Sequence, residues 1–282
     1  MKNICIVGMG SIGSRHYTIL KYKFPDSSFW LCDPVKGFKV YKEVCDQEFD
    51  LCVICVPSAF HVEIAKDFIN TKSFFIEKPL DSNISKIEEN LDFFKNKKTM
   101  IGCNFWFSKH TEELKRFLPI CLFANIKAHT FLPLWRENYK ELYSSRKDLG
   151  GGVLGDYSHE IHLVYQILGP PKNVRVIKRK LTDFTVDTED YALITFEYED
   201  KIVNIEVSYL CQDKHRVSEV VLPNGSRKII DFSGGKQLPY QQTVEDTNET
   251  YKRQWDYFFQ TGKPINSYDD AYNLLKIIDN AF

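Results

Sequence analysis

The chain has 282 residues, 43% of them apolar, which is enough for one large domain or two domains of ordinary size with hydrophobic cores. Its 37 lysine and arginine residues nearly balance its 38 aspartate and glutamate residues, so the charge indicates neither a nucleic-acid partner nor a charged tail. Every apolar run is far shorter than a membrane span, and residues 1–3 lead directly into a predicted strand, which leaves no room for a signal peptide. We therefore expect a cytoplasmic protein that binds neither nucleic acid nor a membrane.

The segment 7–13, VGMGSIG, follows the apolar run 4–7 and predicts a strand, a glycine turn and a helix start, in that order. Gly8 allows the tight turn, Gly10 lets backbone approach a pyrophosphate, and Gly13 lets the helix pack close to the strand. The helix N-terminus adds free N–H groups and a positive dipole end. The residues expected to contact a dinucleotide here are Gly8, Gly10, Ser11, Ile12 and Gly13. The alternative is a glycine-rich turn without a ligand.

An acidic residue, Asp33, follows the second apolar run at residues 29–32. At this place a carboxylate accepts hydrogen bonds from the adenosine ribose, and it repels a 2'-phosphate. Asp33 therefore supports the dinucleotide interpretation and predicts NAD rather than NADP as the cofactor.

The first 118 residues alternate between apolar strand patterns and helical patterns, which predicts a doubly wound parallel sheet. The predicted strands are 3–7, 28–32, 51–56, 73–77 and 99–103, and the predicted helices are 11–22, 60–70, 84–96 and 109–117. Residues 34–50 are too few for a full helix and strand, so we expect this part of the sheet to be trimmed. We expect residues 1–118 to form an NAD-binding Rossmann domain.

Beyond Pro119 the strands are longer, alternating and rich in aromatic residues, which predicts an antiparallel sheet. The predicted strands are 121–132, 173–182, 190–198, 202–210, 217–222 and 227–232, with helices at 153–168, 247–261 and 268–281. Asn224 and Gly225 predict a hairpin. The fold class is therefore α/β followed by α+β, and residues 119–282 are expected to form an open, largely antiparallel sheet with helices on one face.

The helices of this second domain are too few to cover both faces of its sheet. Apolar and aromatic side chains on an uncovered face usually mark an interface. We therefore expect a homo-oligomer, a dimer or a tetramer, with residues 119–282 serving both substrate binding and assembly.

Eight cysteines are present, and Cys52 and Cys55 have the C-x-x-C spacing. Five of them fall in predicted buried strands, where cysteine behaves as a small hydrophobic residue: Cys5, Cys32, Cys52, Cys55 and Cys103. Residues three apart in a strand point to opposite faces, and no second pair has ligand spacing. We therefore predict neither a metal site nor a disulfide.

Two loops follow the strands that end near residues 56 and 77, and ligands bind at this edge of a parallel sheet. The residues expected to face the cofactor are Val56, Pro57, Ser58, His61, Glu77 and Lys78. Pro79 favours an extended backbone at Lys78. Beside an oxidised nicotinamide the pKa of Lys78 would fall toward neutrality, which suits proton exchange with a substrate hydroxyl. The alternative is a surface lysine paired with Glu77.

The segment 150–162, GGGVLGDYSHEIH, places Asp156 and His159 three apart on one face of a predicted helix. A carboxylate beside an imidazole orients it and raises its basicity, which gives an acid/base pair. Asp156 could instead complement the helix dipole, and His159 or His162 could be a hydrogen-bonded interface residue.

These stretches together resemble the glucose-fructose oxidoreductase, inositol dehydrogenase and rhizopine-catabolism protein family, Gfo/Idh/MocA, over nearly the whole chain. Residues 8–13 match its nucleotide fingerprint and residues 57–61 its P-x-x-x-H loop. Residues 77–79 match its E-K-P signature, residues 150–161 its glycine-rich loop and catalytic helix, and residues 258–282 its closing helices.

The resemblance implies an NAD(P)-dependent oxidoreductase acting on a hydroxyl or keto carbon of a sugar or nucleotide sugar. It implies that Lys78 is the proton shuttle and that Asp156 and His159 lie beside the reacting carbon. Because His162 stands where many members have an aspartate, either histidine could be the catalytic one. The D-x-S-H-E order at residues 156–160 resembles a subgroup associated with cell-surface sugar biosynthesis.

Residues 132–139 and 143–147 combine aromatic side chains with arginine and lysine, which suits a sugar carrying a diphosphate or a carboxylate. The alternative is a long loop packed over the cleft, or a subunit contact. The candidate substrate-binding residues are Asn104, Trp135, Arg136, Tyr139 and His162.

Two other functions are compatible with this fold: redox-assisted glycoside cleavage with NAD retained between turnovers, and regulation by dinucleotide binding without turnover. A non-catalytic regulator would be expected to lose its catalytic groups, whereas Lys78, Asp156 and His159 are all present.

Overall fold

The computed structural model describes residues 1–233 and 245–279. It divides into two compact units, Met1–Cys103 with Tyr251–Asn273, and Asn104–Thr250 with Leu274–Phe282. This division differs from the expected one at residue 118, because residues 104–118 contribute to the second core and residues 251–273 pack on the first sheet.

The first unit is built on a parallel sheet of order β2-β1-β3-β4-β5. Its strands are β1 (Asn3–Val7), β2 (Ser28–Cys32), β3 (Leu51–Ile54), β4 (Ser73–Ile76) and β5 (Lys98–Ile101). Between residues 34 and 50 the chain forms only short 3-10 turns and adds no strand. The predicted Rossmann sheet, with its trimmed segment, is confirmed.

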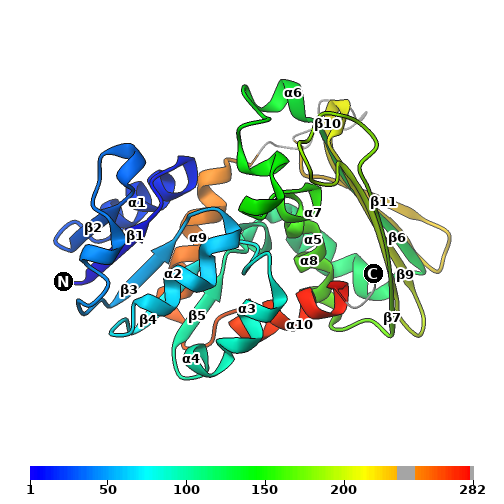
Figure 1. The fold of residues 1–282 in the computed structure, drawn as a ribbon. Helices are drawn as coiled ribbons and strands as arrows, with labels where there is room; N and C mark the ends of the chain where they lie inside the picture. The colour runs from blue at the N-terminus through cyan, green and yellow to red at the C-terminus, as the bar shows by residue number, and fades with distance from the viewer. Residues whose placement is uncertain (234–244, 280–282) are drawn as a thin grey trace. The chain divides into compact units, whose positions relative to one another are not determined.

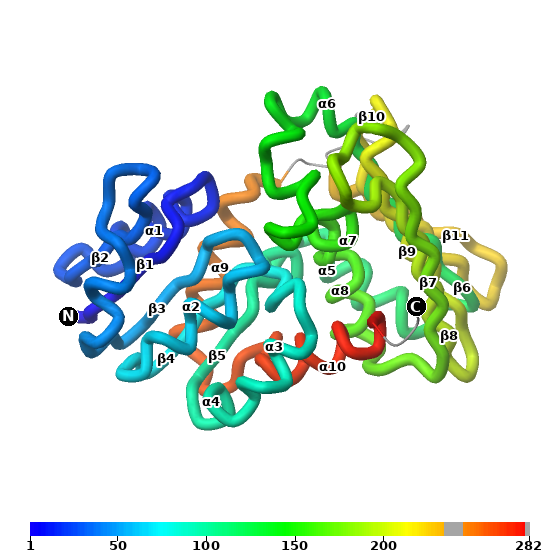
Figure 2. Tube along the Cα trace, viewed as in Figure 1, coloured from blue at the N-terminus to red at the C-terminus, as the bar shows by residue number. Residues whose placement is uncertain are grey.

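Helices cover both faces of this sheet. They are α1 (Ser11–Lys23), α2 (His61–Asp67), α3 (Ile84–Glu89), α4 (Leu91–Lys95), α9 (Thr247–Gln260) and the first part of α10 (Tyr268–Asp279). Phe75 of β4 packs on His16 of α1 and Trp255 of α9, and α9 runs alongside the sheet in Figure 2. The neighbouring Phe74 faces the other way and packs on Phe94 of α4.

One helix prediction in this unit was wrong. Residues 84–96 form two helices, α3 and α4, separated at Asn90. The side-chain amide of Asn90 donates to the Lys86 carbonyl at 2.8 Å, and asparagine side chains that bond the backbone compete with a regular helix.

The second unit is built on a sheet of order β11-β10-β6-β9-β8-β7, in which only β6 and β9 pair in parallel. Its strands are β6 (Phe123–Phe131), β7 (Asn173–Arg179), β8 (Tyr191–Glu197), β9 (Ile202–Ser208), β10 (Leu210–Val221) and β11 (Arg227–Asp231). The predicted, largely antiparallel sheet is confirmed. Gly225, with φ of 78°, forms the hairpin between β10 and β11.

One face of this sheet is covered by helices α5 (Lys109–Phe117), α7 (Val153–Asp156) and α8 (Ser158–Leu168), as Figure 1 shows. A short helix, α6 (Leu132–Trp135), follows β6. Alternate residues such as Ile126 and Ile205 point into the core under the helices. Within the described residues no helix is drawn over the opposite face.

Most strands of this unit end within a few residues of their predicted bounds, but one helix and one strand differ more. The helix expected at 153–168 is broken at Tyr157, where φ and ψ are −102° and 23°, outside the helical region. The strand expected at 217–222 begins at Leu210, because it continues past a bulge before His215. The last residues of the helix expected at 268–281 lie outside the described residues.

All eight cysteines are free thiols. Cys55 and Cys103 lie just beyond β3 and β5 rather than inside them, because those strands end at Ile54 and Ile101. Among the described residues, no group of three histidine, cysteine or acidic side chains is arranged to hold a metal ion. None of the described helices has the length and apolar character needed to cross a membrane.

Candidate active site

The glycine turn between β1 and α1 has the geometry of a phosphate site. A side chain at Gly8, where φ is 91°, would meet the Cys55 carbonyl at 2.6 Å, and one at Gly13 would meet the Gly8 carbonyl at 1.8 Å. Gly10, in contrast, faces open space. α1 has no side-chain cap and no acidic residue in its first turn, which begins with Ser11 and Ile12. The first N–H groups of α1, which no side chain caps, therefore adjoin open space at Gly10, an arrangement that suits phosphate oxygens.

Asp33, after β2, is fixed to the same turn. Its carboxylate accepts hydrogen bonds from the backbone N–H groups of Met9 at 2.8 Å and Lys36 at 3.2 Å. Each carboxylate oxygen has a further lone pair, so Asp33 retains acceptor capacity for ribose hydroxyls.

His61 connects the two loops at this edge of the sheet. Its buried ring contacts the Val56 carbonyl through Nε2 at 2.8 Å and the Pro79 carbonyl through Nδ1 at 2.9 Å. Burial lowers the pKa of His61, although both carbonyls favour its protonated form. With both nitrogens engaged, His61 holds the loop of Pro57 and Ser58 against the E-K-P loop.

Glu77 belongs to a buried hydrogen-bond relay that the sequence analysis did not identify. The indole N–H of Trp255 donates to Nδ1 of His16 at 3.0 Å, and Nε2 of His16 lies 2.8 Å from Oε1 of Glu77. Since Nδ1 accepts a hydrogen bond, Nε2 carries the proton that is donated to the carboxylate. The histidine in the second turn of a dinucleotide-binding helix was the available sequence signal.

The same carboxylate accepts a hydrogen bond from the backbone N–H of Lys78 at 3.3 Å. Burial alone would raise the pKa of Glu77, but the hydrogen bond from His16 and the charge of Lys78 hold it below its usual value. Gly102 leaves room for this group, because a side chain there would lie 3.0 Å from Oε2 of Glu77. The Lys78 side chain is half-buried, and its backbone N–H is held by the carboxylate of Glu77, which belongs to the relay.

In the second unit, Asp156 is surrounded by hydroxyl groups. It accepts hydrogen bonds from Tyr143, from Ser144 at 2.8 Å and from Tyr209 at 2.7 Å. Burial, followed by the negative charge of Asp156, raises the pKa of both tyrosines well above the usual value. Asp156 thus joins its helix to the segment 143–145 and to the end of β9.

His159 stacks on Phe105, with ring centroids 4.6 Å apart and an interplanar angle of 15°. Phe105 also carries Arg216 on its ring at 4.4 Å, and Nε of Arg216 lies 2.6 Å from Oε1 of Glu160. His159 is half-buried, whereas His162 is 3% exposed, so His159 is the histidine better placed to reach a ligand.

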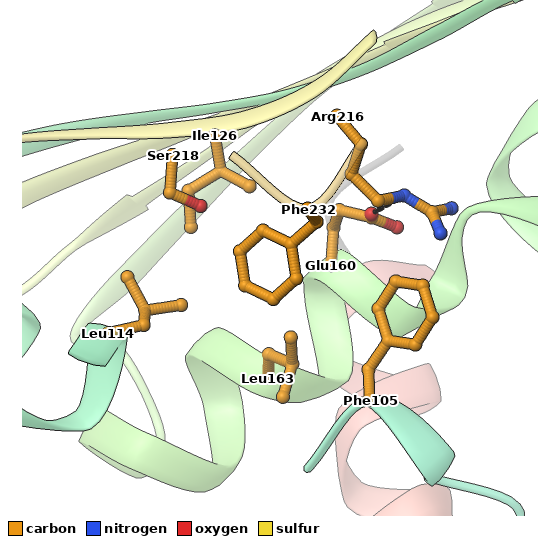
Figure 3. A pocket seen from close by; sticks show the side chains of 8 residues that line it. All are labelled: Phe105, Leu114, Ile126, Glu160, Leu163, Arg216, Ser218 and Phe232. Carbon is orange, nitrogen blue, oxygen red and sulfur yellow. Dashed lines mark ion pairs between the residues drawn. The ribbon is translucent and has the colours of Figure 1, made fainter. Parts of the chain in front are cut away.

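A small cavity lies beside these residues. Its lining is Phe105, Leu114, Ile126, Glu160, Leu163, Arg216, Ser218 and Phe232, as shown in Figure 3. Its volume of about 10 Å³ is close to that of a single water site.

The candidate substrate-binding residues fall into two groups. Asn104 is buried and its side-chain amide donates to the Thr250 hydroxyl at 3.0 Å. It therefore links the segment after β5 to α9. Tyr139 packs against the core of the second unit. Trp135 and Arg136, in contrast, stack on each other at the end of α6, and Trp135 is 37% exposed.

Comparison with protein families decides how the two units are classified. Residues 31–105 match the model of an oxidoreductase family with an NAD-binding Rossmann fold, and residues 126–227 match the Gfo/Idh/MocA C-terminal domain. The two matches together span more than half of the chain. The chain belongs to the Gfo/Idh/MocA oxidoreductase family. The resemblance seen in the motifs is confirmed.

Solved structures of similar fold cover this family member almost completely. Myo-inositol 2-dehydrogenase from Lactobacillus plantarum has a TM-score of 0.78 at 16% identity, covering 99% of this chain and 96% of its own. GenD2 from gentamicin A biosynthesis, in complex with NAD, has a TM-score of 0.77 at 19% identity, with coverages of 99% and 93%. The WlbA dehydrogenase from Chromobacterium violaceum, in complex with NADH and UDP-GlcNAcA, has a TM-score of 0.77 at 14% identity, with coverages of 99% and 92%. No curated protein matches the chain.

Proposed function

We propose that this protein is an NAD-dependent dehydrogenase or reductase that acts on a hydroxyl or keto carbon of a sugar or nucleotide sugar. The observation that carries the proposal is the glycine turn, where open space at Gly10 adjoins the uncapped N-terminus of α1 and the carboxylate of Asp33. Structures of similar fold include an inositol dehydrogenase and a dehydrogenase bound to NADH and UDP-GlcNAcA, which supports this substrate class.

In this proposal the residues of the first unit hold the cofactor and one proton. The first turn of α1 binds the pyrophosphate, and Asp33 accepts from the ribose and disfavours a 2'-phosphate. NAD, when bound, supplies the hydride acceptor, or NADH the donor. Lys78 takes the hydroxyl proton when the alcohol is oxidised and returns it when the ketone is reduced. The Glu77 relay fixes the backbone from which Lys78 extends.

In the second unit we assign His159 and Asp156 different tasks. His159 is half-buried rather than buried, and it would orient or share the hydroxyl proton. Asp156, at the end of α7, already accepts from three hydroxyl groups, so it would hold the walls of the substrate site next to α8, which carries His159.

We also propose a homo-oligomer that pairs through the uncovered face of the second sheet. Ile177 of β7 and Ile202 of β9 are 48% and 47% exposed and lie on that face, opposite the core-facing positions of their strands. Apolar side chains on an open sheet face are typical of subunit interfaces.

The experiment that tests the function is a panel of sugars and nucleotide sugars, incubated with NAD or NADH, with absorbance and products followed together. A dehydrogenase interconverts NAD and NADH in proportion to oxidised or reduced sugar. Glycoside cleavage without net change of NAD would instead establish the redox-assisted glycosidase. Dinucleotide binding without turnover of any sugar in the panel would contradict the proposal and favour a regulator.

A further inference from the structure

The guanidinium of Arg136 is held by aromatic side chains and has an unused donor. Its central carbon lies 4.2 Å from the ring centroid of Trp135 and 5.7 Å from that of Tyr143. Its Nε atom is buried, and none of the described residues accepts a hydrogen bond from it. A buried donor without an acceptor is unfavourable, and the planar fork of arginine matches carboxylate and phosphate oxygens.

Lys214 brings a second cation to the same indole ring. β10 has extra residues between Leu210 and His215 relative to β6, and Lys214 lies in this bulge. Its Nζ atom is 6.0 Å from the ring centroid of Trp135. Burial, followed by the charge of Arg216, lowers the pKa of Lys214. Bulges commonly re-aim side chains beside functional sites.

The carboxylates near this cluster are committed elsewhere. Glu160 pairs with Arg216, and Asp156 accepts from hydroxyl groups, including that of Tyr143. Over residues 1–233 and 245–279, the structure records no ion pair for Arg136 or Lys214. Two cations thus approach one aromatic ring, and among the described residues neither has a recorded ion pair.

We propose that Arg136 and Lys214, set against Trp135, form a subsite for an oxyanion group, a carboxylate or a phosphate, carried by the sugar substrate. This inference rests on the proposed function and specifies its substrate class. The indole offers an apolar platform, Arg136 offers a directional donor, and Lys214 adds charge from the opposite segment of chain.

The subsite is one aromatic side chain away from Asp156. Tyr143, which faces the Arg136 guanidinium, donates its hydroxyl to Asp156, and Tyr209 does the same while its ring lies 6.5 Å from that of Trp135. An anionic group at Arg136 and a sugar ring beside Asp156 therefore belong to one ligand. The bulge position of Lys214 explains why strand patterns alone did not reveal this residue.

The test measures binding rather than turnover, by ligand-observed NMR titration of the NAD-loaded protein. Two matched pairs of probes are used: glucuronate against glucose for the carboxylate, and uridine diphosphate against uridine for the phosphate. We expect at least one anionic probe to bind about tenfold or more tightly than its neutral partner, because the neutral probe cannot form the charged hydrogen bond with Arg136. Added salt should lower the affinity of the anionic probe and leave that of its neutral partner unchanged.

Arg136→Gln should abolish this preference and Lys214→Gln should reduce it, while Lys180→Gln, a surface lysine elsewhere in the unit, should leave it unchanged. Unaltered NAD binding and circular dichroism identify variants that remain folded. Equal binding of charged and neutral probes, or a preference that survives both substitutions, overturns the subsite. If the anionic preference holds but no sugar is oxidised or reduced, the subsite stands and the proposed function fails.

Discussion

Replacing His16 by phenylalanine removes the centre of the buried relay while preserving a ring of similar size. The substitution deletes the donor to Glu77 and the acceptor for the Trp255 indole N–H, at a residue that is 0% exposed. A hydrogen bond to a charged group contributes about 1.5–3 kcal/mol, and an orphaned buried donor costs about 1–3 kcal/mol. We therefore expect a loss of about 3–5 kcal/mol of unfolding free energy at neutral pH, a large part of a typical total.

The loss should depend on pH, and its direction follows from Glu77. Its pKa is lowered in the folded protein, so the carboxylate contributes stability above its unfolded pKa, and this contribution is lost as the pH falls through the folded value. Without His16 the ionised form of the buried Glu77 side chain is no longer stabilised. The difference in unfolding free energy between the unmodified protein and the His16→Phe variant should therefore be largest near pH 7. It should shrink as the pH falls, and disappear once Glu77 is protonated in both folded proteins, below its lowered folded pKa.

Urea unfolding followed by tryptophan fluorescence, at several pH values, measures this effect. Tyr22→Phe, on the exposed side of the same helix, is the matched control and should change stability by less than about 0.5 kcal/mol. A His16→Phe loss below about 1 kcal/mol, or one of constant size across the pH range, would refute the reasoning about the relay.

Three further outcomes are expected. Asp33→Ala should narrow the difference between the NAD and NADP affinities in a binding titration. Tighter binding of NADP than of NAD by the unmodified protein would contradict the assignment of NAD as the cofactor. Light scattering at micromolar concentration should report a dimer or a larger assembly, and Ile177→Lys should weaken it; a monomeric unmodified protein contradicts the proposed interface. His159→Asn should lower turnover and shift its pH profile more than His162→Asn does; the reverse order would place His162 in the site instead.

The first unit was predictable because its signals are local. A strand, a glycine turn and a helix start within residues 4–13 define the dinucleotide loop, and continuous apolar runs define the parallel strands. The antiparallel sheet was equally readable from alternation along the chain. Breaks within helices were missed because they depend on single side chains, as at Asn90.

The contacts that organise the site were less visible, because they join distant segments. His16 and Trp255 lie 239 positions apart, and the Tyr209 hydroxyl reaches Asp156 across 53 positions. No periodicity or motif links such pairs. The bulge that carries Lys214 likewise depends on how β10 pairs with β6, which is determined by the folded sheet.

The central claim, that Lys78 exchanges the substrate proton, is tested most directly by Lys78→Met. This substitution keeps the length and apolar stem of the side chain and deletes the titratable amine. With a substrate from the panel, turnover should fall by about 100-fold or more, the usual scale for losing a general acid or base, while NAD binding and folding persist. Lys66→Met, an exposed lysine on α2, should leave turnover unchanged. Full activity in Lys78→Met would contradict the mechanism.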